Sequence, residues 1–366
     1  MHKKSKYNLL QPTFWWLNLL MGSLMLIAGF AGQSAPSLHP FLALLGLIYP
    51  ILIIVQLLFL LGWILFRNIR FLLPLMVLLI SYPNLKTIIG FHCGAGKPTQ
   101  SDIQLFTYNV KGFSPGKAQP WSPALKTEIL DYITDKKADI ICMQEYRPSQ
   151  KLPARFQALI DTGSYYFNNY FGGSSWKKNG LIIASRFPSA GHDYLKLKEG
   201  RTFAIFSDLV VQQDTLRLIN IHLASIGLSS NDLDFLTSSA LENQQHNIPW
   251  FRWRKIYHKL KTAFEFHENQ IHQIRQCINT SPYPVVLCGD FNDTPASYAY
   301  HQASGLLKDT FLGKACSLNA TYAGPLPFLR IDYVFIPPQL KTVWYRRHKI
   351  HYSDHFALSV GLNFRR

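Results

Sequence analysis

Three long apolar runs fill the first ninety residues and predict helices that cross a membrane. The runs cover residues 14–31, 41–66 and 71–90. A spanning helix needs roughly 20 consecutive apolar residues, and the first two runs meet this length readily. The third meets it when Pro83, Asn84 and Lys86 lie near the membrane surface, where a lysine can extend its ammonium into water. We therefore expect an N-terminal transmembrane anchor over residues 1–90, with three helices favoured over two.

A different pattern begins at residue 102, where short apolar runs rich in β-branched residues end in polar ones. Such runs predict strands, several of them buried on both faces. Between them, Ser122-Pro123 opens one helical segment, and apolar residues recur at helical spacing through residues 250–278. Strands interspersed with helices predict a layered α/β domain over residues 102–366, with the small, polar residues 91–101 as a linker. The predicted strands are residues 103–109, 139–145, 181–185, 203–211, 215–223, 285–290 and 331–336.

Basic flanking residues predict the orientation of the anchor. Lysines precede the first run, and Arg67 and Arg70 lie between the second and third runs, whereas residues 32–40 contain neither Lys nor Arg. The positive-inside rule places the N-terminus and the Arg67–Arg70 loop in the cytoplasm. With a third span, the C-terminal domain is extracytoplasmic. With a re-entrant third run, it stays in the cytoplasm.

The charge balance points to anionic partners, and the cysteines argue against a zinc site. The net charge of +16 favours nucleic acid, phosphorylated small molecules or anionic lipid headgroups. Basic surfaces are also common without such a partner. The five cysteines are scattered and odd in number, which argues against a CxxC metal site and against a complete disulfide framework.

Carboxylates, carboxamides and histidines follow the predicted strands, where a scaffold can bring them together. Acidic side chains with Asn, in the absence of cysteine ligands, favour a hard cation such as Mg²⁺ or Mn²⁺. A separate Asp can take a proton from water, and a His paired with an Asp can stabilise charge on phosphoryl oxygens. This set of groups is suited to hydrolysis of a phosphate ester.

The order of these motifs resembles the endonuclease/exonuclease/phosphatase family. The series TYN, MQE, NGLIIASR, NIHL, GDFND, RIDYVF and SDH extends through residues 102–366. The resemblance implies a deoxyribonuclease-like fold, a four-layer α/β sandwich of two β-sheets flanked by helices. The preceding transmembrane helices are similar to those of membrane-anchored bacterial members.

The resemblance also implies which residues bind a metal ion and activate water. Glu145 would be the main ligand of Mg²⁺ or Mn²⁺, assisted by Asn109 and Asp354. Asp290 would orient or deprotonate the attacking water, and Asn292 would hold that water or the phosphate.

Further positions matching the family's motifs would contact the phosphate group. His222 would contact the scissile phosphate or act as an acid. His355 would contact the phosphate, with Asp332 fixing its tautomer. Arg201 and Asn220 are additional candidates for binding substrate phosphate.

Taken together, these features predict a membrane-tethered, divalent-metal-dependent phosphoesterase that is nuclease-like and cleaves phosphodiester or phosphomonoester bonds. A lipid or inositol-phosphate phosphoesterase of sphingomyelinase type is the alternative, and a non-catalytic binding module is a third. Residues 247–266 mix aromatic and basic side chains, which suits nucleic acid, a membrane interface or a solvated helix face equally. The sequence leaves the oligomeric state open.

Overall fold

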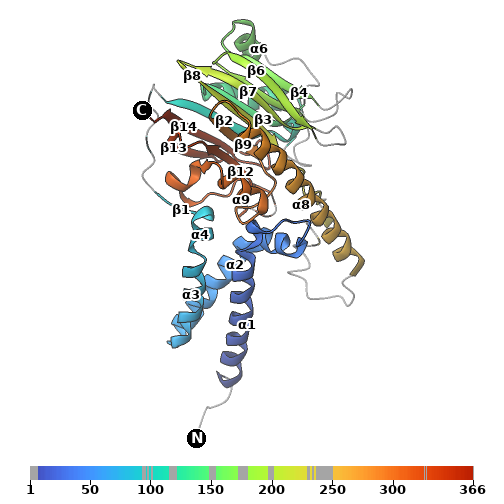
Figure 1. Cartoon of the computed structure of the whole chain (residues 1–366). Coiled ribbons are helices and arrows are strands. Elements are labelled where there is room, and N and C mark those ends of the chain that lie inside the picture. The colour runs from blue at the N-terminus through green and yellow to red at the C-terminus, as the bar shows by residue number, and fades with distance from the viewer. Residues whose placement is uncertain are drawn as a thin grey trace.

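The computed structural model describes residues 7–92, 96, 99, 102–114, 122–147, 154–171, 180–196, 202–228, 231–232, 235, 250–324, 326 and 328–365. A group of helices from the N-terminal part of the chain stands below a globular part built around β-sheets (Figure 1).

Two six-stranded sheets form the centre of the globular part. The first sheet has the order β13 (Leu340–His348), β14 (Ala357–Phe364), β2 (Ile103–Asn109), β3 (Ile140–Tyr146), β5 (Gly180–Ser185) and β4 (Tyr166–Phe171). The second has the order β10 (Lys308–Asp309), β12 (Asp332–Ile336), β9 (Val285–Asp290), β8 (Asp214–His222), β7 (Thr202–Val211) and β6 (Ser189–Lys196).

Three apolar clusters divide the globular part into four layers. One cluster joins the inner faces of the two sheets, and it includes Leu105 from β2 and Leu218 from β8. The first sheet is covered on its other face by α5 (Pro123–Asp135) and α6 (Ala154–Asp161). The second sheet is covered by α8 (Trp250–Asn279) and α9 (Tyr298–Ser304). The predicted four-layer sandwich is confirmed.

Each sheet contains one parallel pair of strands joined by a helix, and these pairs place the strand-end residues. β2 and β3 pair in parallel across α5, and β8 and β9 pair in parallel across α8. α5 begins as predicted, because the Ser122 hydroxyl accepts a hydrogen bond from the Leu125 amide and Pro123 occupies the first turn. The carboxyl ends of parallel strands lie at one edge of a sheet, which is where ligands bind in open α/β folds.

The N-terminal part contains α1 (Tyr7–Ala28), α2 (Pro40–Leu65), α3 (Leu72–Ile80) and α4 (Tyr82–Ile88). Segments Gln11–Gln33 and Pro40–Leu65 are long and apolar enough to cross a membrane. The third run forms two helices, α3 and α4, which are bent by 70° relative to each other. Pro83, in the first turn of α4, explains the break, because proline lacks an amide hydrogen and its ring clashes with the carbonyl four residues earlier.

The end of the N-terminal part is integrated into the globular part rather than leading directly into a linker. β1 (Ile89–Phe91) pairs with β11 (Cys316–Leu318) in antiparallel register. Arg330 Nη2 donates a hydrogen bond of 2.7 Å to the Thr87 carbonyl at the end of α4. The boundary that we expected at residue 90 therefore falls inside a strand, and most of residues 91–101 lie outside the described part of the chain.

The start of α2 also contacts the globular part. Thr294 Oγ1 donates a 2.9 Å hydrogen bond to the carbonyl of Gly46. A Cβ atom at Gly46 would lie 3.0 Å from Ala31 Cβ and 3.2 Å from the Ala296 carbonyl oxygen, so only glycine fits without a shift of its neighbours. On the other side, Ser37 donates from its amide and its hydroxyl to Glu268 of α8, each at 2.9 Å.

Candidate active site

Asp290, the last residue of β9, is at the centre of a cluster of polar side chains where the two sheets meet. Its side chain is fully buried. One carboxylate oxygen accepts hydrogen bonds from Asn109 Nδ2 at 2.9 Å and from Asn292 Nδ2 at 3.3 Å. The other accepts from the Asn292 amide at 2.8 Å. Burial raises the pKa of Asp290 above its ordinary range, and the charge of nearby His355 offsets part of this rise. A fixed carboxylate with a raised pKa is suited to accept a proton from water.

Glu145 reaches the same edge through an irregularity in β3. Its φ angle is +54°, and the pairing of β3 with β5 shifts register between Met143 and Tyr146. Such a bulge re-aims a side chain that regular alternation would direct elsewhere. Glu145 Oε1 lies 3.3 Å from Asn109 Nδ2. A positive φ at a residue other than glycine costs on the order of 1 kcal/mol or more, and such strain is concentrated at functional sites.

His355 and Asp332 form the predicted pair. His355 Nδ1 lies 3.0 Å from Asp332 Oδ2, and both residues are buried. His355 Nε2 lies 3.7 Å from Asp290 Oδ2. Burial disfavours the charged imidazole, but the carboxylates of Asp332, Asp290 and Asp354 outweigh it and raise the pKa of His355 to about 10. His355 is therefore cationic at neutral pH, and its Nε2 proton is available to an anion.

His222, the last residue of β8, lies between two of the predicted catalytic carboxylates. Its Nε2 atom is 3.6 Å from Glu145 Oε1 and 3.6 Å from Asp290 Oδ2. The parallel register of β8 and β9 pairs His222 with Asp290, which fixes this neighbourhood through the backbone. The position suits contact with a phosphate held between the two sheets.

Asp354 is held beside the end of β2 and has a cationic neighbour that the sequence analysis did not identify. The Lys111 ammonium forms an ion pair with Asp354. The Lys111 amide donates to Asn109 Oδ1 at 3.0 Å, and the Ser353 hydroxyl donates to the Asn109 carbonyl at 2.8 Å. Lys111 lies two residues after Asn109, the end of a predicted strand. This position is the feature of the sequence that could have identified it as a site residue.

One predicted residue, Asn220, is not part of this cluster. Asn220 is fully buried, donates from Nδ2 to the carbonyls of Met143 and Ile182, and accepts from Gln144 Nε2. Its amide therefore joins the two sheets internally, and the expectation that it contacts phosphate is not supported by this geometry. Arg201, the other predicted phosphate contact, lies outside the described residues.

The cluster opens into a pocket of about 590 Å³ whose lining includes Glu145, Asn292, Asp354 and His355. This volume falls within the range of roughly 300–1,000 Å³ that is typical of small-molecule sites. Tyr322 also lines the pocket and was missed, because it lies outside the regular strand pattern and forms only an isolated β-bridge with His355. Burial raises the pKa of Tyr322 to about 12, so its phenol stays protonated and can donate a hydrogen bond.

Two groups of side chains present ligand atoms for a metal ion. The ligand atoms of Asp290, Asp332 and His355 lie within 4.8 Å of one another. Glu145 and Asp354, with the Asn109 carboxamide, offer hard oxygen atoms, and Asp354 already attracts a cation in the form of Lys111. The second group consists of oxygen donors alone, the ligand type that Mg²⁺ and Mn²⁺ prefer.

Comparison of the sequence with protein-family models gives two matches. Residues 106–355 match the model described as the endonuclease/exonuclease/phosphatase family. Residues 11–88 match a model described as a domain of unknown function. No curated protein sequence is significantly similar to the chain.

Several solved structures share the fold at low sequence identity. The endonuclease/exonuclease/phosphatase structure from Beutenbergia cavernae has a TM-score of 0.51 and 18% identity, and the match covers 72% of each chain. The corresponding protein from Bacteroides vulgatus has a TM-score of 0.51 and 16% identity, with 73% of this chain and 100% of that chain covered. The human Nocturnin catalytic domain has a TM-score of 0.50 and 17% identity, with 72% and 94% covered.

Proposed function

The chain belongs to the endonuclease/exonuclease/phosphatase family and is a hydrolase of phosphate esters. We propose that it acts as a divalent-metal-dependent phosphoesterase tethered to a membrane. The observation that carries this proposal is the convergence on Asp290. Its carboxylate is oriented by Asn109 and Asn292 and lies within 4 Å of two histidines, one of them held by Asp332.

Glu145, Asn109 and Asp354 would hold the metal ion, with Mg²⁺ or Mn²⁺ as the expected species. When bound, such an ion polarises the phosphate and stabilises the leaving oxygen. The strained backbone at Glu145 supports this assignment, since the bulge aims its carboxylate toward Asn109. Hard oxygen donors at this position favour Mg²⁺ and Mn²⁺ over softer ions.

The chain's own groups would carry the remaining chemistry. Asp290 accepts a proton from the attacking water, and its raised pKa makes it a stronger base than an exposed carboxylate. The His355 imidazolium donates through Nε2 to a phosphoryl oxygen, while Asp332 holds Nδ1. His222, whose Nε2 lies 3.6 Å from both Glu145 and Asp290, would contact the phosphate beside the metal ligands.

A generic phosphodiester tests the chemistry without knowledge of the natural substrate. The full-length protein in detergent should release p-nitrophenol from bis-p-nitrophenyl phosphate in the presence of Mg²⁺ or Mn²⁺. Chelation by EDTA should lower the rate at least about tenfold, because the metal ion stabilises charge in the transition state, and excess Mg²⁺ should restore it. Absence of hydrolysis with every divalent cation tried would favour the non-catalytic binding module instead.

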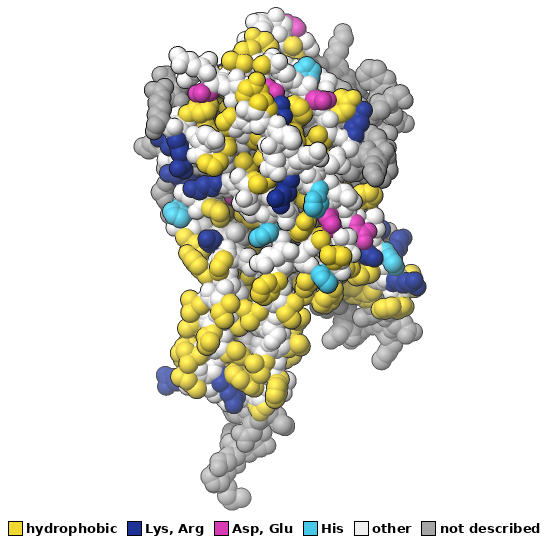
Figure 2. Space-filling model, viewed as in Figure 1, with side chains coloured by type: hydrophobic (Ala, Val, Ile, Leu, Met, Phe, Trp, Pro, Cys, Tyr) yellow, Lys and Arg dark blue, Asp and Glu magenta, His cyan; other side chains and the backbone are white. Residues whose placement is uncertain are grey.

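We also propose that the catalytic domain is extracytoplasmic. The first residues of α1 lie at the end of the helices far from the sheets, and α4 leads into the globular part (Figure 1). Figure 2 shows Lys and Arg side chains at that same far end, below a continuous apolar surface. The bent pair α3–α4 would then serve as a broken third span that connects the basic Arg67–Arg70 loop to β1.

Reporter fusions after Gln100 should distinguish the two orientations. Alkaline phosphatase fused there should be active, and a fluorescent protein that matures only in the cytoplasm should stay dark. Fusions after Phe66, at the opposite end of α2, provide the control and should give the reverse result. Fluorescence after Gln100 without phosphatase activity would place the domain in the cytoplasm.

A further inference from the structure

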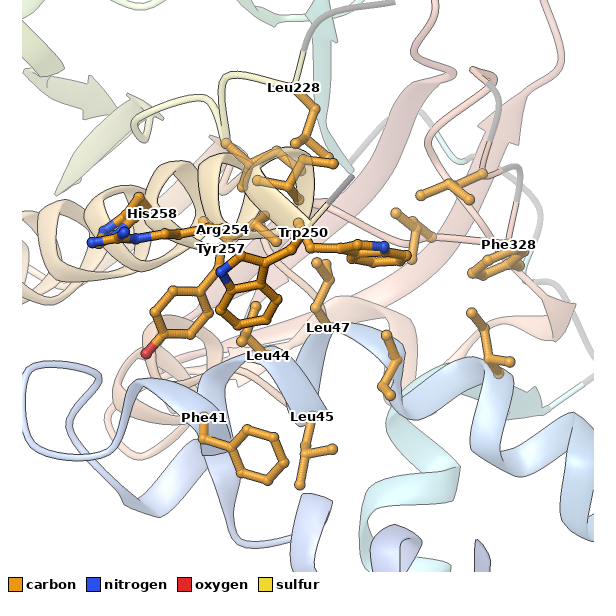
Figure 3. Close-up of a pocket in the computed structure, with 18 residues that line it drawn as sticks. Phe41, Leu44, Leu45, Leu47, Leu228, Trp250, Arg254, Tyr257, His258 and Phe328 are labelled. Carbon is orange, nitrogen blue, oxygen red and sulfur yellow. The ribbon is translucent and has the colours of Figure 1, made fainter. Parts of the chain in front are cut away.

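A second, larger cavity lies between the start of α2 and the N-terminal half of α8 (Figure 3). Its volume is about 780 Å³. Figure 3 shows Leu44 and Leu47 of α2 on one side and Trp250 and Tyr257 of α8 on the other. The lining is almost entirely apolar, and among its residues Arg254 is the only one with a permanent charge. A cavity with this lining favours a hydrocarbon ligand.

The apolar cavity adjoins the pocket that contains the catalytic cluster. Five residues line both, so a ligand can occupy the two spaces at once. The shared residues are Leu47, Ile226, Leu228, Leu326 and Leu329. A single molecule with a phosphate ester at one end and an apolar chain at the other matches this arrangement.

The cavity lies at the level where a membrane surface is expected. α2 has 26 residues, which corresponds to about 39 Å, whereas the hydrocarbon core of a bilayer is about 30 Å thick. The first turns of α2 can therefore stand at the lipid headgroups, and these turns contact the globular part through Gly46. Lipids enter a protein from this level, because both their headgroup and their chains are accessible there.

The N-terminal end of α8 has the composition of a segment that lies on a membrane surface. Trp250 and Phe251 are 76% and 68% exposed, and Arg252, Arg254 and Lys255 beside them are also exposed. Aromatic side chains favour the membrane interface, and basic ones attract anionic headgroups. This end of α8 lies beside the start of α2, across the cavity from Leu44 and Leu47.

We propose that this cavity binds the acyl chain of a phosphorylated lipid whose phosphate ester is hydrolysed at the Asp290 cluster. The proposal rests on the proposed function and names its substrate class. In the reaction the hydroxyl of water joins phosphorus, the phosphorus–oxygen bond to the alcohol breaks, and the alcohol leaves with a proton. A nucleic acid fits the cavity less well, because its backbone phosphates require a basic groove and the lining is apolar.

The test compares two substrates that share a leaving group and differ only in their chain. Methyl p-nitrophenyl phosphate and hexadecyl p-nitrophenyl phosphate both release p-nitrophenol. The full-length protein in mixed detergent micelles with Mg²⁺ should hydrolyse the hexadecyl ester with the higher kcat/KM. Ile48→Trp would fill the cavity from α2, at a side chain that lines it and is 39% exposed.

The variant should lower the hexadecyl-to-methyl ratio of kcat/KM about tenfold or more, because several methylenes lose their apolar environment. Hydrolysis of the methyl ester should be unchanged, which also shows that the variant is folded. Ile54→Trp is the matched control, since Ile54 lies on the same helix, is 45% exposed and does not line the cavity. Leu44→Trp, from another lining residue, should reproduce the effect of Ile48→Trp.

Other results would overturn either the inference or its premise, and the two cases are distinguishable. Equal kcat/KM values for the two esters in the native protein, or the same ratio in native protein and in Ile48→Trp, would remove the lipid site and leave the phosphoesterase intact. Faster cleavage of single-stranded DNA than of the hexadecyl ester, unaffected by Ile48→Trp, would also reject the lipid site. Failure to hydrolyse any ester with any divalent cation would instead reject the phosphoesterase.

Discussion

Replacing Glu145 by Gln should lower kcat/KM by a factor on the order of 10³, comparable to the loss of a central charge-stabilising group. The substitution keeps the size and hydrogen-bonding shape of the side chain but removes the negative charge assigned to the metal ion. The fold should survive, because the residue lies at the end of a strand. Glu and Gln would also bear the same backbone strain from the positive φ angle at this position. The measurement is the initial rate of bis-p-nitrophenyl phosphate hydrolysis over a range of Mg²⁺ concentrations.

Direct metal binding separates this effect from a general loss of structure. Glu145→Gln should weaken binding of Mn²⁺ in calorimetric titration while leaving the thermal unfolding midpoint near the native value. Glu265→Gln is a suitable control, since Glu265 lies on α8 and its nearest basic partner is Lys261, at 3.7 Å on the same helix. Near-native activity of Glu145→Gln at limiting Mg²⁺ would remove Glu145 from the metal site.

Replacing Asp332 by Asn should lower kcat/KM by a factor on the order of 10² to 10³, by analogy with the loss of an acid that orients a catalytic histidine. Asp332 accepts from His355 Nδ1 and so leaves the Nε2 proton for the substrate. An asparagine amide can instead donate to Nδ1, which leaves a neutral ring with its single proton on Nε2, and a neutral imidazole stabilises charge on the phosphoryl oxygens less than an imidazolium does. Asp332 is therefore a positioning residue, and kcat should fall more than KM rises.

The pH profile gives a readout that a purely structural defect would not change. Burial disfavours charge on His355, but Asp332 and the other carboxylates raise its pKa from 6.5 to about 10. The contribution of this charge to the free energy of unfolding is fully present below pH 6.5 and is lost as the pH rises toward 10. Asp332→Asn should lower the pKa, so the alkaline loss of activity should begin at lower pH. Asp135→Asn, at an exposed ion pair with Arg155, should leave the profile unchanged.

Most interior strands were predictable from the sequence, whereas the interior strand β14 and three edge strands were not among those predicted. β2, β3, β8 and β9 are buried on both faces, so their apolar runs stand out from the surrounding chain. β4, β6 and β13 each lie at the edge of a sheet. Edge strands carry polar and charged residues that discourage pairing with other molecules, which weakens the apolar signal. The segments YFNNYF, SAGHDYLK and LKTVWYRRH show this composition.

The candidate site was predictable where residues follow central strands. His222 and Asp290 are paired by backbone register, so their convergence follows from a parallel pair of strands. Asn220 lies two positions before His222, and alternation along a strand would place both side chains on one face. The structure keeps both on the face toward the first sheet, but Asn220 is fully buried between the sheets, where the carbonyls of Met143 and Ile182 accept from it. Pattern alone could not reveal this use of a buried carboxamide.

The hydrogen bonds from Thr294 to α2 and from Arg330 to α4 hold the catalytic domain on its helices instead of on a flexible tether. With the helices in a bilayer, the domain would stay at one height and one tilt, and its substrates would arrive by lateral diffusion. The rate would then follow the number of substrate molecules per unit area of membrane. Diluting the substrate with inert lipid should slow the enzyme even when the total amount of substrate in the suspension is constant.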